Sequence, residues 1–128
     1  MSHASQHTID LLEGYFAAME AKDSDRFASY YAEDITLTFA NDPTVTGRDA
    51  VRQQMIDTLS KVESLAHPLL TVWQEDDGVV IFEVRSIWRF NDGTTATIGA
   101  CSIFTVRDDT FTDQRIYVDN APVLDHIS

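Results

Sequence analysis

Basic side chains are scarce in this sequence of 128 residues. Nine Lys and Arg stand against 21 Asp and Glu, so the formal net charge is −12 and the pI is near 4.4. Proteins that bind phosphate backbones or anionic lipid do so through clustered Lys and Arg, which neutralise the charge of the partner. We therefore expect neither nucleic acid nor a membrane surface to be a partner.

Cysteine and long apolar runs are also lacking. Cys101 is the single cysteine, so it forms no disulfide within the chain. Its small and apolar neighbours predict a buried, unreactive thiol. No apolar stretch has the length of a signal peptide or of a membrane-spanning helix. These absences predict a cytoplasmic protein.

Glycine-rich loops and clusters of metal ligands are missing as well. Gly78 and Gly93 fall in short turns between strand-like runs, which leaves no glycine-rich loop to bind a phosphate group. His3, His7 and His126 lie near the two ends of the chain, and no set of His, Cys and acidic residues has the spacing of metal ligands. We predict no cofactor and no metal ion.

The residues that are present suffice for one domain. With 44% hydrophobic residues, a chain of this length builds one core, which we place at about residues 8–122. Apolar residues recur with helical spacing in the first half and alternate with polar residues in the second half. The predicted helices are 9–21, 24–34 and 47–64, and the predicted strands are 35–40, 69–75, 79–90, 95–107 and 111–119.

The strand predicted at 79–90 has two different faces. Its apolar residues share one side with Ser86, while the other side carries Ile87 between charged residues. Short turns join the strands of the second half, so we expect an antiparallel sheet with the three helices over its concave face. The space between sheet and helices is either filled with side chains or holds a ligand. The outer face, with Ile87 and Ile103, contacts either a second subunit or solvent.

Four local strings occur in an order and spacing typical of a known superfamily. They are Tyr15-Phe16-Ala17-Ala18-Met19, Tyr31-Ala32-Glu33-Asp34, Gly47-Arg48-Asp49-Ala50-Val51 and Arg115-Ile116-Tyr117-Val118-Asp119. On these strings the chain resembles the SnoaL-like, nuclear transport factor 2-like superfamily, with its ketosteroid isomerase-like and limonene epoxide hydrolase-like relatives. The resemblance implies an α+β fold, a cone-shaped, curved and mostly antiparallel sheet covered by three N-terminal helices. It also implies an apolar pocket and a homodimer, for which we expect the outer sheet face to form the contact.

Members of this superfamily that catalyse generally use one or two carboxylates in the pocket. Asp119 is similar to the last-strand Asp that serves as acid/base in SnoaL-type cyclases, and Tyr15 is similar to the Tyr that donates to the oxyanion in ketosteroid isomerases. Phe39 and Ser102 stand where a ketosteroid isomerase has its two pocket aspartates. Leu37 and Phe39 stand where a limonene-type epoxide hydrolase has Tyr and Asn. These departures argue against both of those mechanisms.

We predict Asp119 as the catalytic acid/base and Tyr15 or Ser102 as the hydroxyl donor. A carboxyl group in an apolar pocket is suited to moving protons near neutral pH. Asp119 shares a strand face with Arg115 and Tyr117 if no bulge intervenes, and its alternative role is a strand cap or an ion pair with Arg115. The predicted pocket wall consists of Phe16, Met19, Tyr31, Phe39, Met55, Trp73, Trp88 and Tyr117.

Two positions leave alternatives open. Only one of the neighbouring residues Tyr30 and Tyr31 faces inward, and the sequence does not decide which. His67 precedes Pro68 at the start of a strand, where it is either a base in the pocket or a solvent-facing residue.

The predicted function is that of a cofactor-independent acid/base enzyme of the isomerase, cyclase or dehydratase type. Its substrate is a small, largely apolar, carbonyl-bearing molecule in the cone pocket. The alternative is a non-catalytic module that binds a small ligand or a protein in the same cone. A third interpretation fills the pocket with Phe39, Trp73 and Trp88 and leaves a dimer-forming scaffold.

Overall fold

Four helices and eight strands form within residues 2–127, the part of the chain that this computed structural model describes. The helices are α1 (Gln6–Glu20), α2 (Ser24–Ala28), α3 (Arg48–Ser60) and α4 (Ala121–Ile127). The strands are β1 (Ser2–His3), β2 (Tyr31–Phe39), β3 (Val45–Thr46), β4 (Val62–Ala66), β5 (Leu69–Gln74), β6 (Val79–Phe90), β7 (Thr95–Arg107) and β8 (Thr110–Val118).

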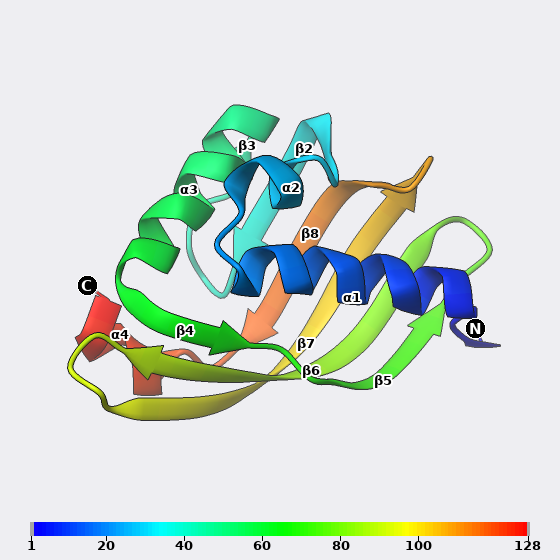
Figure 1. Cartoon of the computed structure of the whole chain (residues 1–128). Coiled ribbons are helices and arrows are strands. Elements are labelled where there is room, and N and C mark those ends of the chain that lie inside the picture. The colour runs from blue at the N-terminus through cyan, green and yellow to red at the C-terminus, as the bar shows by residue number, and fades with distance from the viewer. Residues whose placement is uncertain (1, 128) are drawn as a thin grey trace.

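All the strands belong to one curved sheet (Figure 1). Its order is β1-β5-β6-β7-β8-β2-β3, and β4 pairs with β6 beyond the segment that pairs with β5. Neighbours are antiparallel except β2 and β8, which run parallel. Helices α1, α2 and α3 lie on one side of the sheet, and α4 lies near the β6–β7 turn (Figure 1). The predicted α+β fold, a curved and mostly antiparallel sheet under three N-terminal helices, is confirmed.

The inner face of the sheet forms the core together with the helices. Along β6 burial alternates from Val80 to Phe90, with the apolar residues and Ser86 inside. This confirms the predicted faces of the strand. Helix α1 packs against the same side, and its Leu12 and Ala18 are completely buried. The strict period of two along β6 therefore decides which side of the sheet receives the helices.

The outer face of the three long strands is mixed and exposed. Ile87 and Tyr117 are 38% and 54% exposed, and the register places Cys101 between Glu83 and Tyr117. Cys101 is exposed, so the prediction of a buried thiol is wrong. The reason is that successive residues of a strand point to opposite faces, and Ser102 takes the inner one.

Strand β8 contains a bulge that reverses its faces. Val106 of β7 pairs with Phe111, but Thr105 pairs with Asp113, so Thr112 is an extra residue on β8. Phe111 is buried on the inner side, and beyond the bulge it is Gln114 that is buried. An extra residue shifts the alternation by one position. Uninterrupted alternation from Phe111 would point the odd-numbered residues of β8 inward. After the bulge it is the even-numbered residues that point inward.

The second helix is shorter than predicted. Helix α2 ends at Ala28, and Tyr31–Asp34, which we predicted as helical, open strand β2. Tyr31 pairs with Phe111 of β8 and is completely buried, so it is Tyr31 and not Tyr30 that faces inward. The parallel pairing of β2 with β8 overrides the helical spacing of the aromatic residues.

Two further segments differ from their predicted state. Helix α3 ends at Ser60, and Val62, predicted as helical, is buried together with Leu65 in the edge strand β4. Residues 121–127, most of which lie beyond the core that we placed at about residues 8–122, form α4, which buries Val123 completely. In both segments contact with β6 and β7 supplies the burial that a short sequence window does not reveal.

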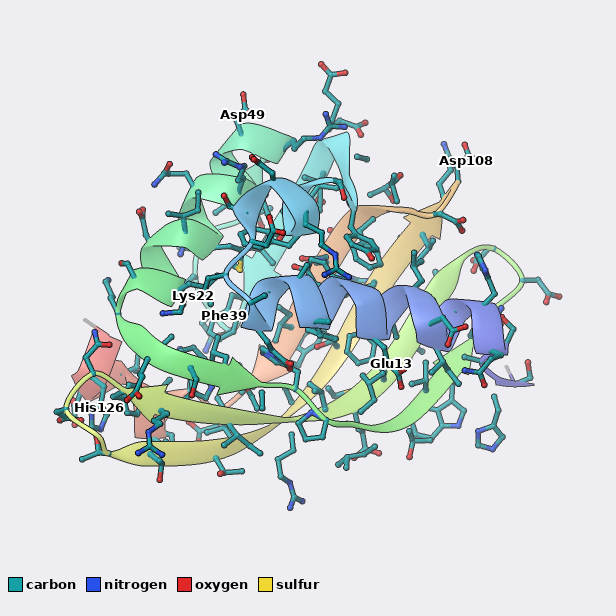
Figure 2. The ribbon with its side chains drawn as sticks, in the orientation of Figure 1. Glu13, Lys22, Phe39, Asp49, Asp108 and His126 are labelled. Carbon is teal, nitrogen blue, oxygen red and sulfur yellow. The ribbon has the colours of Figure 1, made fainter. Side chains whose placement is uncertain are left out.

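The surface is strongly acidic. Asp49 at the start of α3 and Asp108 in the β7–β8 turn project away from the body of the protein (Figure 2). None of the helices within residues 2–127 is long and apolar enough to cross a membrane.

Candidate functional site

A pocket of about 460 Å³ lies between the inner face of the sheet and the helices. Sites for small molecules have volumes of about 300–1,000 Å³ and mainly apolar walls. The wall here is mainly apolar and comes from α1, β2, α3 and strands β6 to β8. It includes five predicted wall residues, Phe16, Met19, Phe39, Met55 and Trp88, as well as Tyr15 and Ser102.

Four residues that we predicted in the pocket do not line it. Asp119 is exposed, and its Oδ1 accepts a hydrogen bond of 3.1 Å from the backbone N–H of Ala121 at the start of α4. Tyr117 is on the outer face, 54% exposed. Both placements were wrong because the bulge at Thr112 turns the odd-numbered residues of β8 outward.

The other two misplaced residues are Trp73 and Tyr31. On β5 it is Val72 that is buried, so Trp73 points the other way, where its ring stacks on His3 with 6.4 Å between the centroids. Tyr31 is buried behind Tyr15 and does not reach the cavity.

Tyr15 lines the pocket, and its hydroxyl group is paired with that of Tyr31, which lies behind it. The Tyr15 and Tyr31 hydroxyl oxygens are 2.7 Å apart, and the Tyr15 ring packs edge-on against Phe104 and Phe111. Burial raises the pKa of Tyr15 to about 12, although interactions with Tyr31 and Gln114 act in the opposite direction. Burial, with the proximity of Tyr15, also raises the pKa of Tyr31. Near neutral pH both groups are therefore protonated, and either hydroxyl can donate the hydrogen bond between them.

Gln114 also lines the pocket, and sequence reasoning missed it. Its side chain is 1% exposed and its Nε2 has no hydrogen-bond partner within residues 2–127. It pairs with Phe104 across β7 and β8, which places it diagonal to Ser102 on the inner face. No local signal identifies Gln114, because only the bulge turns it inward.

Further polar groups come from His67, between β4 and β5, and from strand β6. His67 and Ser86 line the cavity, and the Nε1 of the buried Trp88 has no hydrogen-bond partner in the described part of the chain. The His67 ring stacks on Phe16, with centroids 4.7 Å apart and planes at 21°. The centroid of the Phe16 ring is in turn 5.3 Å from that of Tyr15, so Phe16 packs between His67 and Tyr15. Of the two alternatives for His67, the structure places the residue in the pocket wall.

Exposed residues form the rim of the pocket. Asp42 and Gln54 lie there beside Leu124 of α4. Asp42 is the only carboxylate among the lining residues, and none of them is Lys or Arg. The interior thus offers hydroxyl, amide, indole and imidazole groups and no carboxylate, Lys or Arg.

Together, the curved sheet, its covering helices and the enclosed apolar pocket define a nuclear transport factor 2-like cone. The family model described as SnoaL-like domain matches residues 12–114. The chain belongs to this SnoaL-like family. No curated protein matches the chain in sequence.

Solved structures share this fold at low sequence identity. A protein of Catenulispora acidiphila with a ketosteroid isomerase-like fold, in complex with trimethylamine, is similar with a TM-score of 0.80 and 18% identity, covering 91% of each chain. An epoxide hydrolase of the LEH-like type from M. tuberculosis has a TM-score of 0.78 and 15% identity, covering 93% of this chain and 87% of that one. An ntf2-like protein of unknown function from Burkholderia pseudomallei has a TM-score of 0.82 and 11% identity, covering 97% and 99%. At these identities the likeness shows the fold alone.

Proposed function

We propose that this protein is a cofactor-independent enzyme that moves a proton on a small, largely apolar, carbonyl-bearing molecule held in the pocket. The reaction classes that fit are isomerisation, cyclisation and dehydration. In each of them a carbonyl oxygen gains negative charge in the transition state, and preorganised donors in a water-poor site stabilise that charge.

The observation that carries this proposal is the set of buried donors in an otherwise apolar cavity. The Nε2 of Gln114 and the Nε1 of Trp88 have no partner among the described residues, and the Tyr15 and Ser102 hydroxyls lie in the same wall. Leaving a buried donor unpaired costs about 1–3 kcal/mol. A carbonyl oxygen beside the Gln114 amide would remove that cost and accept the hydrogen bond. Trp88 offers a separate donor elsewhere in the pocket, because it lies eight residues along β6 from Val80, which the register places in line with Phe104 and Gln114.

The charge of the pocket favours a neutral substrate. No Lys or Arg lines it, and its one carboxylate, Asp42, lies at the exposed rim of a protein with a net charge of −12. A carboxylate or phosphate ligand would find no counter-ion there, so a ketone, an enone or a hydroxyketone fits better.

Deuterium exchange tests the proposal directly. Apolar ketones such as 2-tetralone and cyclohexenone are screened for binding by thermal shift, and those that bind are incubated with the protein in D₂O. We expect the hydrogens next to the carbonyl to exchange faster than in buffer, as followed by NMR. Absence of both binding and exchange across the set would contradict the proposal.

Gln114 offers a variant with opposite effects on stability and binding. Gln114→Leu removes an unpaired buried amide, so we expect the free energy of unfolding to stay unchanged or to rise by up to about 1 kcal/mol. Binding of the ketone should weaken. The matched control is Gln53→Leu, an exposed amide on α3 that hydrogen-bonds to Asp57. A large loss of stability with unchanged affinity would assign Gln114 to the structure alone.

One observation favours a second candidate, a non-catalytic binding module. Asp119, the expected acid/base, is outside the pocket, and no carboxylate lies in the interior. A module of this kind would bind the same ketones without accelerating their exchange, so the D₂O experiment separates the two functions.

We further propose that the protein forms a homodimer through the outer sheet face. The exposed Ile87 and Tyr117 and the free Cys101 lie on this face beside charged residues of both signs. A mixed, self-complementary surface of this kind suits a two-fold contact.

A further inference from the structure

His67 is held at a break between two strands. Ala66 pairs with Ile87 and Leu69 pairs with Val84, so the register places His67 opposite Ser86. Residues opposite each other in a sheet point to the same side, and Ser86 faces the pocket. The His67 side chain is 11% exposed and lines the same cavity.

Helix α1 fixes the imidazole from two directions. Phe16 stacks on the ring, and four positions later Glu20 lies on the same face of the helix. The Oε1 of Glu20 accepts a hydrogen bond of 2.7 Å from the backbone N–H of His67 and lies 3.6 Å from its Nδ1. The carboxylate therefore holds the backbone of His67 by a hydrogen bond and lies beside the Nδ1 edge of its ring.

This arrangement distinguishes the two ring nitrogens. Nδ1 is buried and makes no hydrogen bond within residues 2–127; the Glu20 Oε1 lies 3.6 Å from it, beyond hydrogen-bonding distance but close enough for an electrostatic interaction. Interaction with the His67 side chain lowers the pKa of Glu20, against the effect of its partial burial, so the carboxylate is ionised near neutral pH. An ionised neighbour at Nδ1 favours the proton on that nitrogen and leaves Nε2 with a free lone pair.

We infer that His67 is the catalytic acid/base of the pocket and that Glu20 is the residue that positions it. This inference rests on the proposed function. Histidine is suited to the role because it gains and loses a proton close to neutral pH. It also supplies the proton-transfer group that the exposed position of Asp119 leaves missing.

The reaction balances without any further reactant. Nε2 takes a proton from the carbon next to the carbonyl, the C–H electron pair forms a carbon–carbon double bond, and the carbonyl oxygen becomes an enolate oxyanion. A donor such as Tyr15 or Ser102 stabilises the oxyanion. The imidazolium then returns its proton, either to the same carbon, which gives exchange, or to another carbon of the enolate, which gives isomerisation. Phe16, which packs between Tyr15 and His67, is in a position to support the substrate between the two groups.

The first test measures deuterium exchange of a bound ketone by His67→Gln. We expect the exchange rate to fall at least about 100-fold, the usual minimum contribution of a general base, while the affinity for the ketone changes little. Unchanged exchange in this variant, with the wild type active, would overturn the inference and leave the proposed function intact. If the wild type binds the ketone and exchanges nothing, the proposed function fails, and the catalytic role of His67 fails with it.

The second test reads the tautomer of His67 independently of activity. Long-range ¹H–¹⁵N correlation spectra distinguish a protonated Nδ1 from a protonated Nε2, and His67→Gln identifies the His67 signals among the four histidines. We expect the Nδ1–H tautomer in the wild type and a mixture of tautomers in Glu20→Gln, together with slower exchange of the ketone. Glu13→Gln, an exposed carboxylate on the same helix, is the control and should change neither readout. An unaltered tautomer in Glu20→Gln would overturn the positioning role.

Discussion

At the scale of single residues, the tyrosine pair determines what Tyr15 contributes to the pocket. A hydroxyl pair that is fully buried stays protonated near neutral pH, so Tyr15 is available as a hydroxyl group and not as a base. The acid/base step then requires a different group. That separation of tasks, with donors near Tyr15 and a proton carrier near Phe16, is what the packing of α1 provides.

The same pair predicts how stability depends on pH. The pKa of Tyr15 is raised from 10.0 to about 12 in the folded protein. Below pH 10 both folded and unfolded chains keep this proton, and the contribution to stability is constant. Between pH 10 and 12 only the unfolded chain loses it, so the free energy of unfolding falls by about 1.4 kcal/mol per pH unit for this group. The raised pKa of Tyr31 adds a change of the same sign.

Urea denaturation at a series of pH values from 8 to 12 measures this fall. The double variant Tyr15→Phe/Tyr31→Phe lacks both hydroxyls and serves as the reference, so its stability should decline less steeply over the same range. Parallel curves for wild type and double variant would show that the buried hydroxyls do not cause the alkaline loss.

Individual site residues were predictable only where their strand was regular. Ser102 lies on the inner face because β7 alternates without interruption up to Thr105. Asp119 lies outside the pocket and Gln114 lies in its wall because one extra residue, Thr112, precedes both of them. His67 faces the pocket because of its register opposite Ser86, which depends on a pairing between distant segments.

At the scale of elements, helix α1 has a glycine, Gly14, at a position where the Tyr30 side chain leaves no room for a Cβ atom. A Cβ added at Gly14 would lie 2.5 Å from the Tyr30 hydroxyl oxygen and 3.6 Å from the Tyr30 Cζ. The Tyr30 ring is stacked on Phe111 and packs edge-on against Tyr15, so it cannot easily move aside. The glycine therefore reflects the position of one hydroxyl group and not a need for backbone freedom.

Because of this clash, we expect the effect of Gly14→Ala on stability to differ between proteins with and without the Tyr30 hydroxyl. Alanine is more favourable than glycine in a helix by about 1 kcal/mol. In the wild type we expect Gly14→Ala to be neutral or destabilising, because the clash offsets that gain. In a Tyr30→Phe background the hydroxyl is gone, and the same substitution should stabilise the protein by about 1 kcal/mol. Urea denaturation of the four proteins in the double-mutant cycle gives the coupling between the two sites. Equal effects of Gly14→Ala in both backgrounds would show that Tyr30 does not set this limit.

Elements whose burial follows a local period were predictable, and elements defined by distant pairing were not. The faces of β6 follow from an uninterrupted alternation of apolar and polar residues. Most of strand β4 was hidden in a predicted helix because Val62 continues the helical spacing of Met55 and Leu59, and only pairing with β6 makes this segment a strand. The pairing of Tyr31 with Phe111 shortened α2 in the same way.

At the scale of the whole molecule, the net charge of −12 acts on any assembly of the protein. Two copies that meet through the outer sheet face repel each other, and the salt in the solution screens that repulsion over a Debye length of about 10 Å at 0.1 M. A stable contact must then come from the apolar residues of the face together with local pairs of opposite charge. The face offers apolar residues and charges of both signs, since Glu83, Arg85 and Ile87 follow one another on the same side of β6.

The proposed homodimer predicts a specific response to one charge. Ile87→Glu places a carboxylate on the outer face beside its two-fold copy, so the dimer should dissociate while the fold is retained. Sedimentation velocity at low and high salt measures both effects, and in the wild type the dimer should tighten as the salt concentration rises. Leu70→Glu, which changes a more exposed apolar residue on β5, between β1 and β6 in the sheet order, is the control and should leave the dimer unaffected. A wild-type protein that stays monomeric at high salt would refute the homodimer, and an Ile87→Glu protein that stays dimeric would place the contact on another surface.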